Sequence, residues 1–430
     1  MSTESDNPPA KRRKLSSEFS PKTTGVIPSI QAIPALLFAF QNTMSLSLCG
    51  YRVPKINASN LTKSGICSQY RKLALICSSM TPFLVRKLLS GTQKPHLLVK
   101  SILSRHPLNR ELSGNCVDTL VGHRDNVNTC CASSSNEVLF TCSNDGFVKI
   151  WKSPPSQKNE PCDCVASLKH SSRVRSLAIH QTQPLMVTGD DSGKLTAWLL
   201  SPDHTSATHL ATLEGHTGLI LSVKYHPRMR IFVSTSSDGT SRLWNISPDL
   251  KTFDCLLVLF EPTGWVQSAC FHPTNPTVLV TCNEDKTIKF WTLSPDFKSA
   301  KCTSILEGHT ATILSIAFSE DGRFIASTSE DRTAKIWMPS SDGTSARCFA
   351  TLEGHNGPVS DVAFHPVHPG IIATSSYDRT VKLWLLLDGS SSAKQVATLK
   401  GHLSCVLSVN FHKTNLITTT SSDRTAMTWK

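Results

Sequence analysis

Short apolar segments, each ended by turn-forming residues, recur along residues 116–430. In ILSVKYHP (220–227), ILSIAFSEDG (313–322) and VSDVAFHP (359–366), apolar and polar residues alternate as in half-buried β-strands. The stretch IFVSTSSDGTSRLW (231–244) indicates a strand, a tight Asp-Gly turn and a second strand. Because no segment of this kind shows the 3.6-residue period of a helix, we predict an all-β fold.

Tryptophan marks a period of 45–47 residues in the same part of the chain. The period is defined by Trp151, Trp198, Trp244, Trp291, Trp337, Trp384 and Trp429. An Asp lies six residues before six of these tryptophans, and Ser192 takes that place in the second unit. A repeat of about 45 residues built from short strands predicts a propeller with four strands per blade. We therefore expect a seven-bladed β-propeller over residues 116–430, with each sequence repeat ending near its tryptophan.

The repeated positions resemble those of the WD-repeat family over essentially all of residues 116–430. In that family a His, a Ser or Thr, an Asp and the Trp of one blade form a hydrogen-bonded set, and the resemblance implies the same sets here. The matching residues are His123, Asp145 and Trp151; His216, Ser234, Asp238 and Trp244; His309, Ser327, Asp331 and Trp337; His355, Thr374, Asp378 and Trp384; and His402, Thr419, Asp423 and Trp429. A buried Asp needs hydrogen-bond donors, and a His supplies one.

Three departures from the family pattern change the expectations. No tryptophan of the period is followed by Asp. The second unit has Lys169 and His170 instead of Gly-His, and the fourth has Pro262 where the third has His216. We expect blades two and four to be the less rigid ones. The resemblance also implies ring closure: CVDTL (116–120) reads as an outer strand, which would complete the last blade after its third strand at 425–430.

Charge divides the chain into two regions, 1–115 and 116–430. The first holds 16 Lys/Arg and 4 Asp/Glu, whereas the second holds 28 of each, so the net charge of +12 lies in the first. We expect this basic region to be mostly disordered. Its cluster at 8–17, with Lys11, Arg12, Arg13 and Lys14, resembles a nuclear import signal, with a solvated charge run as the alternative. Residues 25–51 carry no charge, but their two prolines and polar residues argue against a membrane anchor.

The repeat leaves few residues for catalysis or metal binding. No phosphate-binding loop, H-E-x-x-H, G-x-S-x-G or C-x-x-C motif occurs, and the 15 cysteines favour a reducing compartment. The His-Pro pairs at His226, His272 and His365 share one repeat position, so we interpret them as turn elements. We expect no enzyme activity and no cofactor. The leading hypothesis is an interaction scaffold in a nuclear complex, with the cytoplasm as a second location.

Two functions are alternatives to the scaffold: a substrate receptor of a ubiquitin ligase, which could recognise phosphopeptides, and a nucleic-acid-associated protein. A substrate receptor of a ubiquitin ligase would favour Trp-Asp-x-Arg after a blade Trp, and no unit has it. A phosphopeptide receptor would favour Arg just before the turn Asp, and no unit has that either. A nucleic-acid-associated protein would use the basic N-terminal arm on phosphates, but aromatic residues are few among its charges. The sequence does not determine the oligomeric state.

Trp265 is the one tryptophan outside the repeat, and it aligns with Leu219 at the start of an inner strand. In a propeller this position and the residue before the turn Asp lie on one face, around the central channel. We predict a partner-binding face formed by Asn126, Arg173, Leu219, Trp265, Asp191, Glu284, Glu330 and Tyr377. Three carboxylates and one Arg favour basic or neutral peptides over phosphorylated ones. The alternative is that Trp265 fills the space left by the missing His of blade four.

Overall fold

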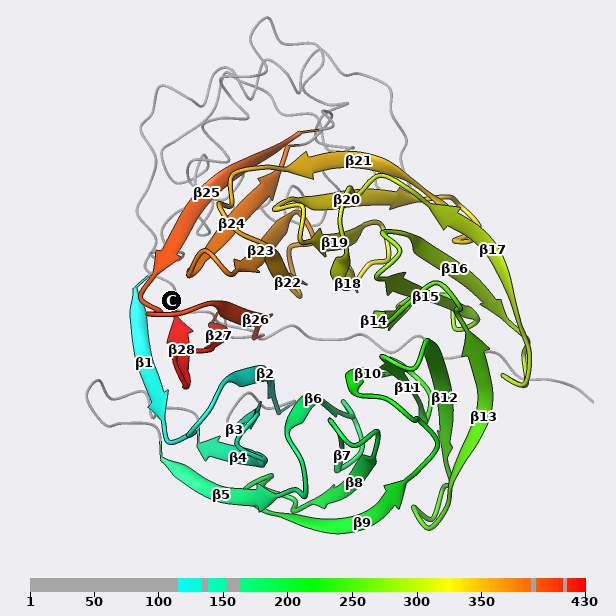
Figure 1. Cartoon of the computed structure of the whole chain (residues 1–430), viewed down its shortest axis with the longest axis vertical. Helices are drawn as coiled ribbons and strands as arrows, with labels where there is room; N and C mark the ends of the chain where they lie inside the picture. Colours follow the sequence, from blue (N-terminus) through cyan, green and yellow to red (C-terminus); the bar gives the residue numbers. More distant parts are fainter. Residues whose placement is uncertain (1–114, 134–137, 153–162, 388–391, 413–415) are drawn as a thin grey trace, which may run out of the picture. The chain divides into compact units, whose positions relative to one another are not determined.

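The computed structural model describes residues 115–133, 138–152, 163–387, 392–412 and 416–430. In this part of the chain, the strands form seven four-stranded antiparallel sheets, which confirms the predicted propeller. Figure 1 shows the sheets standing around a central axis, with one strand of each sheet nearest the axis. The cluster at 8–17 and the uncharged stretch at 25–51 lie outside the described residues. Within them, no helix has the length and apolar character needed to cross a membrane.

Each blade is numbered here from one to seven along the chain, and its strands run from the axis outward. The inner strands are β2 (Val127–Ala132), β6 (Val174–Ile179), β10 (Ile220–Tyr225), β14 (Val266–Phe271), β18 (Ile313–Phe318), β22 (Val359–Phe364) and β26 (Val406–Phe411). The second strands are β3 (Val138–Ser143), β7 (Leu185–Asp190), β11 (Ile231–Ser236), β15 (Val278–Asn283), β19 (Ile325–Ser329), β23 (Ile371–Ser376) and β27 (Ile417–Ser421). The third strands are β4 (Phe147–Lys152), β8 (Leu195–Leu200), β12 (Thr240–Ile246), β16 (Ile288–Leu293), β20 (Ala334–Pro339), β24 (Thr380–Leu386) and β28 (Thr425–Trp429). The outer strands are β5 (Cys164–Lys169), β9 (Ala207–Leu213), β13 (Phe253–Phe260), β17 (Ala300–Leu306), β21 (Ala346–Leu352), β25 (Ala393–Lys400) and β1 (Cys116–Val121).

The hydrophobic core lies between blades rather than within one of them. Every residue of the second strand β11 is buried, because neighbouring sheets cover both of its faces. The tryptophan of each blade packs against the preceding blade: Trp337 of blade five, for example, clusters with Val280 and Phe290 of blade four. Each blade thus covers the apolar face of its neighbour, which explains why the repeat needs a large aromatic residue at one fixed position.

The ring closes as the family resemblance implied. Strand β1, which precedes blade one in the sequence, pairs antiparallel with β28 near the end of the chain, in a register that sets Val121 opposite Thr425. Figure 1 shows the two strands side by side. The pairing leaves blade seven with four strands, so that its third strand has no open edge.

A β-bulge recurs at the start of the inner strands. In blade three the pairing runs from Ile220 opposite Ser236 directly to Ser222 opposite Thr235, which leaves Leu221 as the extra residue. The same shift occurs in blade two, where Arg175 is the extra residue. A bulge redirects a side chain near the end of a strand, so these residues lie where the inner strands meet one end of the channel.

Candidate functional site

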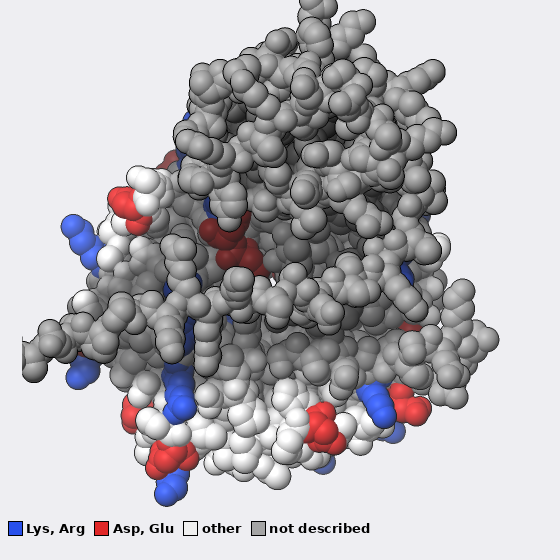
Figure 2. Space-filling view, turned by 180° about the vertical axis from the view of Figure 1, so that it is seen from behind, with Lys and Arg blue, Asp and Glu red and all other residues white. Residues whose placement is uncertain are grey.

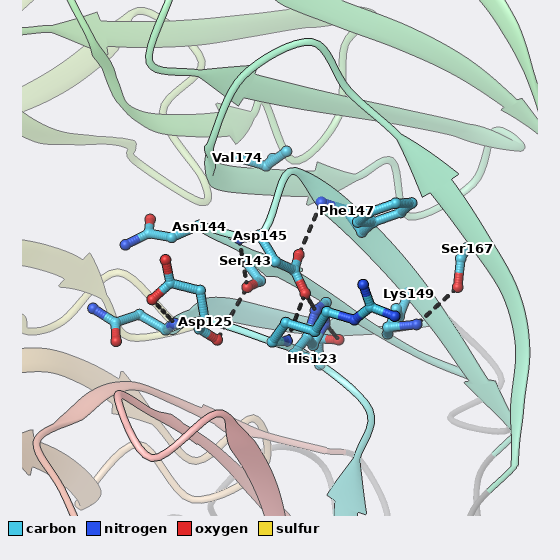
Figure 3. A network of polar contacts seen from close by, with 12 residues as sticks. His123, Asp125, Ser143, Asn144, Asp145, Phe147, Lys149, Ser167 and Val174 are labelled. Carbon is cyan, nitrogen blue, oxygen red and sulfur yellow. Dashed lines mark hydrogen bonds and ion pairs between the residues drawn. The ribbon is translucent and has the colours of Figure 1, made fainter.

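The His, Thr, Asp and Trp of blade one form a continuous hydrogen-bonded chain. Figure 3 shows His123 and Asp145 of this set. His123 Nδ1 lies 2.8 Å from Asp145 Oδ2, and His123 Nε2 lies 2.8 Å from Thr141 Oγ1. The indole N–H of Trp151 donates to the same hydroxyl oxygen at 2.8 Å. The pKa of Asp145 is lowered, since backbone and side-chain donors outweigh the opposing effect of burial. Asp145 is therefore ionised, so His123 donates from Nδ1 and accepts the Thr141 proton at Nε2.

The same chain of contacts recurs in blades three, five, six and seven. It joins His216, Ser234, Asp238 and Trp244; His309, Ser327, Asp331 and Trp337; His355, Thr374, Asp378 and Trp384; and His402, Thr419, Asp423 and Trp429, at distances of 2.7–2.9 Å. These contacts tie four segments of each blade together: its second strand, which carries the Ser or Thr, its third strand, its turn, and the strap, which we define as the segment linking the previous outer strand to the inner strand.

Blade two keeps only part of this network. His170 Nε2 lies 3.4 Å from Thr188 Oγ1, and Trp198 donates to that hydroxyl at 3.1 Å. Ser192 occupies the turn position and donates from its hydroxyl to Asp190 Oδ1 at 2.6 Å. Burial lowers the pKa of His170 to about 4, against the opposing charge of Asp190. His170 is therefore neutral at physiological pH, with a longer and weaker contact than its counterparts.

Blade four replaces the His with a lysine, which the sequence analysis missed. Lys289 Nζ lies 3.1 Å from the turn carboxylate of Asp285 and 3.2 Å from Glu261 Oε2. Thr263 of the strap also donates to Asp285, so strap and turn are joined without an imidazole. The interpretation that Trp265 fills the space of the missing His is wrong, because 44% of Trp265 is exposed and Lys289 reaches the turn carboxylate instead.

The two sets of residues predicted to share one face lie side by side in every blade. The backbone N–H of the residue before the turn Asp, or before Ser192 in blade two, donates to the carbonyl of the residue just before the inner strand, at 2.9–3.0 Å. These backbone hydrogen bonds join Asn144 to Asn126, Asp191 to Arg173, Ser237 to Leu219, Glu284 to Trp265, Glu330 to Thr312, Tyr377 to Pro358 and Ser422 to Cys405. The geometry thus places all eight predicted residues at one end of the ring, which we call the Trp265 face.

Two large aromatic residues are exposed on the Trp265 face. Trp265 and Tyr377 have exposed fractions of 44% and 43%, and neither belongs to a buried cluster of the described residues. The backbone N–H of Trp265 donates to Glu284 Oε2 at 3.1 Å, which fixes the start of β14 beside this carboxylate. Gly264 has a φ of 137°, and a Cβ there would lie 2.8 Å from Glu284 Oε2, so the strap needs glycine to pass. Phe260, 67% exposed, ends the preceding outer strand.

The electrostatics of the Trp265 face differ from the prediction at one point. Arg175, the bulge residue of blade two, forms an ion pair with Asp191 through its guanidinium group. The prediction counted Asp191 as an unbalanced carboxylate, whereas Arg175 neutralises it. Partial burial raises the pKa of the Tyr377 phenol; the charge of Glu330 adds to this rise and that of Arg175 opposes it. Of the eight predicted residues, Glu284 and Glu330 are the exposed carboxylates, while the turns of this face also expose Lys286, Arg332, Arg379 and Arg424.

The His-Pro histidines lie at the opposite end of the ring and stabilise turns. His226 Nδ1 accepts hydrogen bonds from the amides of Arg228 and Met229 at 3.1 and 3.0 Å. His272 and His365 accept from two amides in the same way. In the part of the chain that the structure describes, no group of three His, Cys, Asp or Glu side chains is placed to hold a metal ion, and the cysteines are free thiols.

Charges of both signs are mixed over the surface that Figure 2 leaves visible. This agrees with the equal numbers of acidic and basic residues in 116–430. That visible part of the described surface offers no continuous basic patch of the kind that tracks nucleic-acid phosphates.

The fold and the recurring polar sets define a seven-bladed β-propeller built from repeats of one sequence pattern. The profile of the WD40 family, described as "WD domain, G-beta repeat", matches residues 114–152, 162–198, 207–245, 253–292, 300–338, 346–384 and 393–430. The chain belongs to this family. The solved WD40 propeller domain of Doa1 superimposes with a TM-score of 0.60 at 20% identity, covering 73% of this chain and 96% of that domain. This likeness shows the fold alone.

Two curated proteins resemble shorter parts of the chain. The "Target of rapamycin complex subunit wat1" of Schizosaccharomyces pombe is 31% identical over 155 residues, which make up 34% of this chain and 42% of that protein. The "Polycomb protein EED" of Chaetomium thermophilum is 29% identical over 89 residues, 20% of this chain and 16% of that protein. The chain therefore spans less than half of the length of each of these relatives.

Proposed function

We propose that the protein is a non-enzymatic scaffold that binds partner proteins or peptides on the Trp265 face. One observation carries the proposal: a strap and a turn are joined by the same backbone hydrogen bond in all seven blades, and blades four and six present Trp265 and Tyr377 there. Exposed Trp and Tyr side chains on a rigid support are typical of binding hot spots. Neither aromatic residue serves the core, so their exposure is best explained by contact with a partner.

The charges of this face suggest the chemistry of the partner. Glu284 and Glu330 are exposed carboxylates, while Asp191 is neutralised by Arg175. Arg173 is the exposed cation of the predicted set. A basic or neutral segment would meet complementary charge here, and a phosphorylated one would be repelled by the two glutamates. Phosphorylation of a bound peptide should accordingly weaken binding, and raising the salt concentration should weaken the binding of a basic peptide.

Membership of a nuclear complex is the finer part of the proposal. The relatives include a subunit of a complex and a Polycomb protein, by their names. The basic cluster Lys11, Arg12, Arg13 and Lys14 would supply the import signal. Changing these four residues to Ala in a fluorescently tagged protein should abolish nuclear accumulation. Nuclear retention of this variant would show that import depends on another segment or on a partner.

The binding proposal is tested by recovering partners from cells with the tagged full chain and quantifying them by mass spectrometry. Trp265→Ala and Tyr377→Ala should each reduce the recovery of a principal partner at least about tenfold. Val367→Ala is the matched control, because Val367 is an apolar residue, 64% exposed, in a His-Pro turn at the other end of the ring. If all three variants recover the same partners as the unchanged protein, the Trp265 face is not the binding site.

A further inference from the structure

Four turns at the end of the ring opposite the Trp265 face share one conformation. They link the third strand to the outer strand in blades two to five, and each begins with Ser and has Asp at its third position. In blade four, Phe297 N donates to Ser294 O at 2.9 Å, and in blade five Gly343 N donates to Ser340 O at 2.9 Å. The fourth residue has a positive φ in each turn: 59° at His204, 61° at Leu250, 58° at Phe297 and 72° at Gly343. These four residues therefore occupy equivalent places.

In blades three and four, this fourth residue fills a space beside the preceding blade. Phe297 is 4% exposed and belongs to the cluster between blades three and four. Its ring lies 6.3 Å from that of His226, the turn histidine of blade three, in an edge-on arrangement. Leu250 packs in the same way into the cluster between blades two and three. The repeat thus shows which side chains suit this space: an aromatic ring or a leucine.

Blade five leaves the equivalent space open, because Gly343 has no side chain. A pocket of about 430 Å³ lies there, between blades four and five, within the size range of binding sites for small molecules or side chains. Phe324 and Met338 contribute its apolar surface, and His272 of blade four lines it as His226 lines the site of Phe297. A Cβ on Gly343 would lie 3.7 Å from His272 Cδ2 and 3.9 Å from Asn275 Nδ2, at ordinary contact distance, so a side chain fits.

His272 offers a hydrogen-bond donor at this pocket. Its Nδ1 accepts from the amides of Thr274 and Asn275 at 3.2 and 3.0 Å, so the proton of the neutral ring is on Nε2. The side chain belongs to a residue that is only 8% exposed, and within the described residues Nε2 has no hydrogen-bond partner. In His226, by contrast, Nε2 lies 3.3 Å from the carbonyl oxygen of Pro276. Nε2 of His272 is not among the buried unsatisfied atoms of the described residues, so a carbonyl group from outside the chain would accept its proton in place of solvent.

We propose that this pocket binds a phenylalanine or leucine side chain of a partner peptide, whose backbone carbonyl accepts the Nε2 proton of His272. The exposed carboxylates of Asp321 and Asp342 stand at the rim; Arg323 lies 3.9 Å from Asp321 and offsets its charge, so Asp342 carries the acidic character of the rim. Hydrogen bonds from Ser340 and Thr344 lower the pKa of Asp342 to about 2, so that its charge persists at neutral pH. Basic residues beside the apolar anchor are therefore favoured over acidic ones. The site is a second interaction surface, separate from the Trp265 face.

The test fills the pocket from within. Gly343→Phe and Gly343→Leu copy the side chains that blades four and three carry at the same positive φ, so both variants should fold and melt close to the unchanged protein. Gly343→Ala is the control, because it introduces a Cβ at this φ without occupying the pocket. The probe is a random-peptide phage library selected on the full chain, followed by fluorescence anisotropy of the enriched peptides on each variant.

The enriched peptides that bind independently of Trp265 should share a Phe or Leu that tolerates no Ala replacement. Gly343→Phe and Gly343→Leu should weaken their binding at least about tenfold, and Gly343→Ala at most about twofold. Trp265→Ala should leave it unchanged. The proposal is overturned if no enriched peptide depends on an apolar anchor, if both filled variants bind as well as the unchanged protein, or if only Trp265→Ala abolishes binding. Should one filled variant melt much lower, the other, together with Ala replacement of the peptide anchor, still decides the outcome.

Discussion

Blades three and four solve the same structural problem with different chemistry. In blade three, neutral His216 connects the strap to the ionised Asp238 and to Ser234. In blade four, the ammonium group of Lys289 lies between Asp285 and the buried Glu261. Both arrangements give the turn carboxylate a donor and hold the strap against the sheet. In both blades the turn carboxylate receives a hydrogen-bond donor, although the residue type that supplies the donor differs.

The two arrangements respond differently to loss of the residue that donates to the turn carboxylate. Removing His216 from blade three would leave Asp238 with donors from Thr240 and the backbone amide of Thr217. Removing Lys289 from blade four would leave two carboxylates, one of them nearly inaccessible, without their cation. Burial already raises the pKa of Glu261 above its ordinary value, and the charge of Lys289 opposes that rise. Blade four is therefore held by the buried ion pair of Lys289 and Glu261. Replacing only one of these two residues should lower the free energy of unfolding strongly.

Lys289→Ala should cause the largest loss of folding stability. The variant leaves the Glu261 carboxylate buried without a partner, which costs about 3–5 kcal/mol in comparable buried pairs. His216→Ala should cost less, about 1–3 kcal/mol, because hydrogen bonds are lost but no charge is stranded. Guanidinium unfolding of the full chain, followed by tryptophan fluorescence, measures both.

Lys289→Met with Glu261→Leu serves as the control for this prediction. It removes both charges and keeps the apolar volume, so it should recover much of the stability that Lys289→Ala loses. A loss for Lys289→Ala no greater than that for His216→Ala would mean that the ion pair of blade four contributes little. Blades three and four would then differ in the geometry of their contacts but not in what these contacts contribute to the free energy of unfolding.

The tryptophans of the two blades provide a second, smaller contrast. Trp244 is 3% exposed and donates to Ser234 at 2.9 Å, whereas Trp291 is only partly buried and donates to Thr281 at 3.0 Å. Phe at either position removes the indole N–H and some apolar area. We expect Trp244→Phe to cost about 2 kcal/mol and Trp291→Phe about 1 kcal/mol. Thermal unfolding of both variants at matched concentration tests the order, and a larger loss at Trp291 would contradict it.

A third contrast is the pH dependence. Burial lowers the pKa of His216 below its ordinary value of 6.5, with Asp238 opposing. As the pH falls through 6.5, the unfolded chain binds a proton at this residue and the folded chain does not, so stability is lost on acidification. Asp238, with a pKa of about 2, stays ionised in that range. Blade four has no imidazole in its set and makes no such contribution.

His216→Gln should therefore flatten the fall in unfolding free energy between about pH 7 and pH 5, by at most about 1.4 kcal/mol per pH unit for one proton. Trp265→Ala is the control, because it changes a residue at the same end of the ring without removing any titratable group. Parallel pH profiles for the unchanged protein and His216→Gln would show that His216 titrates alike in the folded and unfolded chains.

The sequence predicts the features that recur in every repeat, but not the contacts that occur in a single blade. The spacing of Trp151 to Trp429 and the alternation of strands were sufficient for the fold, because each blade must bury the same faces, and the family resemblance implied the closing strand. The repeats do not coincide with the blades, because each blade extends past its tryptophan to an outer strand. Lys289 escaped notice because its position carries basic residues in several blades, and only in blade four does the missing His create room for it beside a buried Glu261. The ion pair of Arg175 with Asp191 depends on a bulge, which leaves no sequence signal.

The pocket beside Gly343 shows the same limit. Its turn fits the Ser-x-Asp pattern of its neighbours, and a glycine at a positive φ needs no explanation beyond backbone freedom. Only the packing of Phe297 against His226 reveals that the equivalent residue fills a space, and that Gly343 leaves it open. Such three-dimensional comparison between blades identifies candidate sites that a repeat alignment treats as ordinary turns.

The smallest expected effect on stability is that of Trp265→Ala, and it decides how blade four differs from blade three at the surface. Trp265 is 44% exposed and belongs to no buried cluster of the described residues, while its counterpart Leu219 is half-buried. Because less than the full apolar area of the ring is buried, we expect a loss below about 1 kcal/mol, similar to that of Leu219→Ala. A melting curve of each variant measures this. A loss of about 3 kcal/mol or more, as for a buried aromatic residue, would make Trp265 part of the core and remove the aromatic anchor from the Trp265 face.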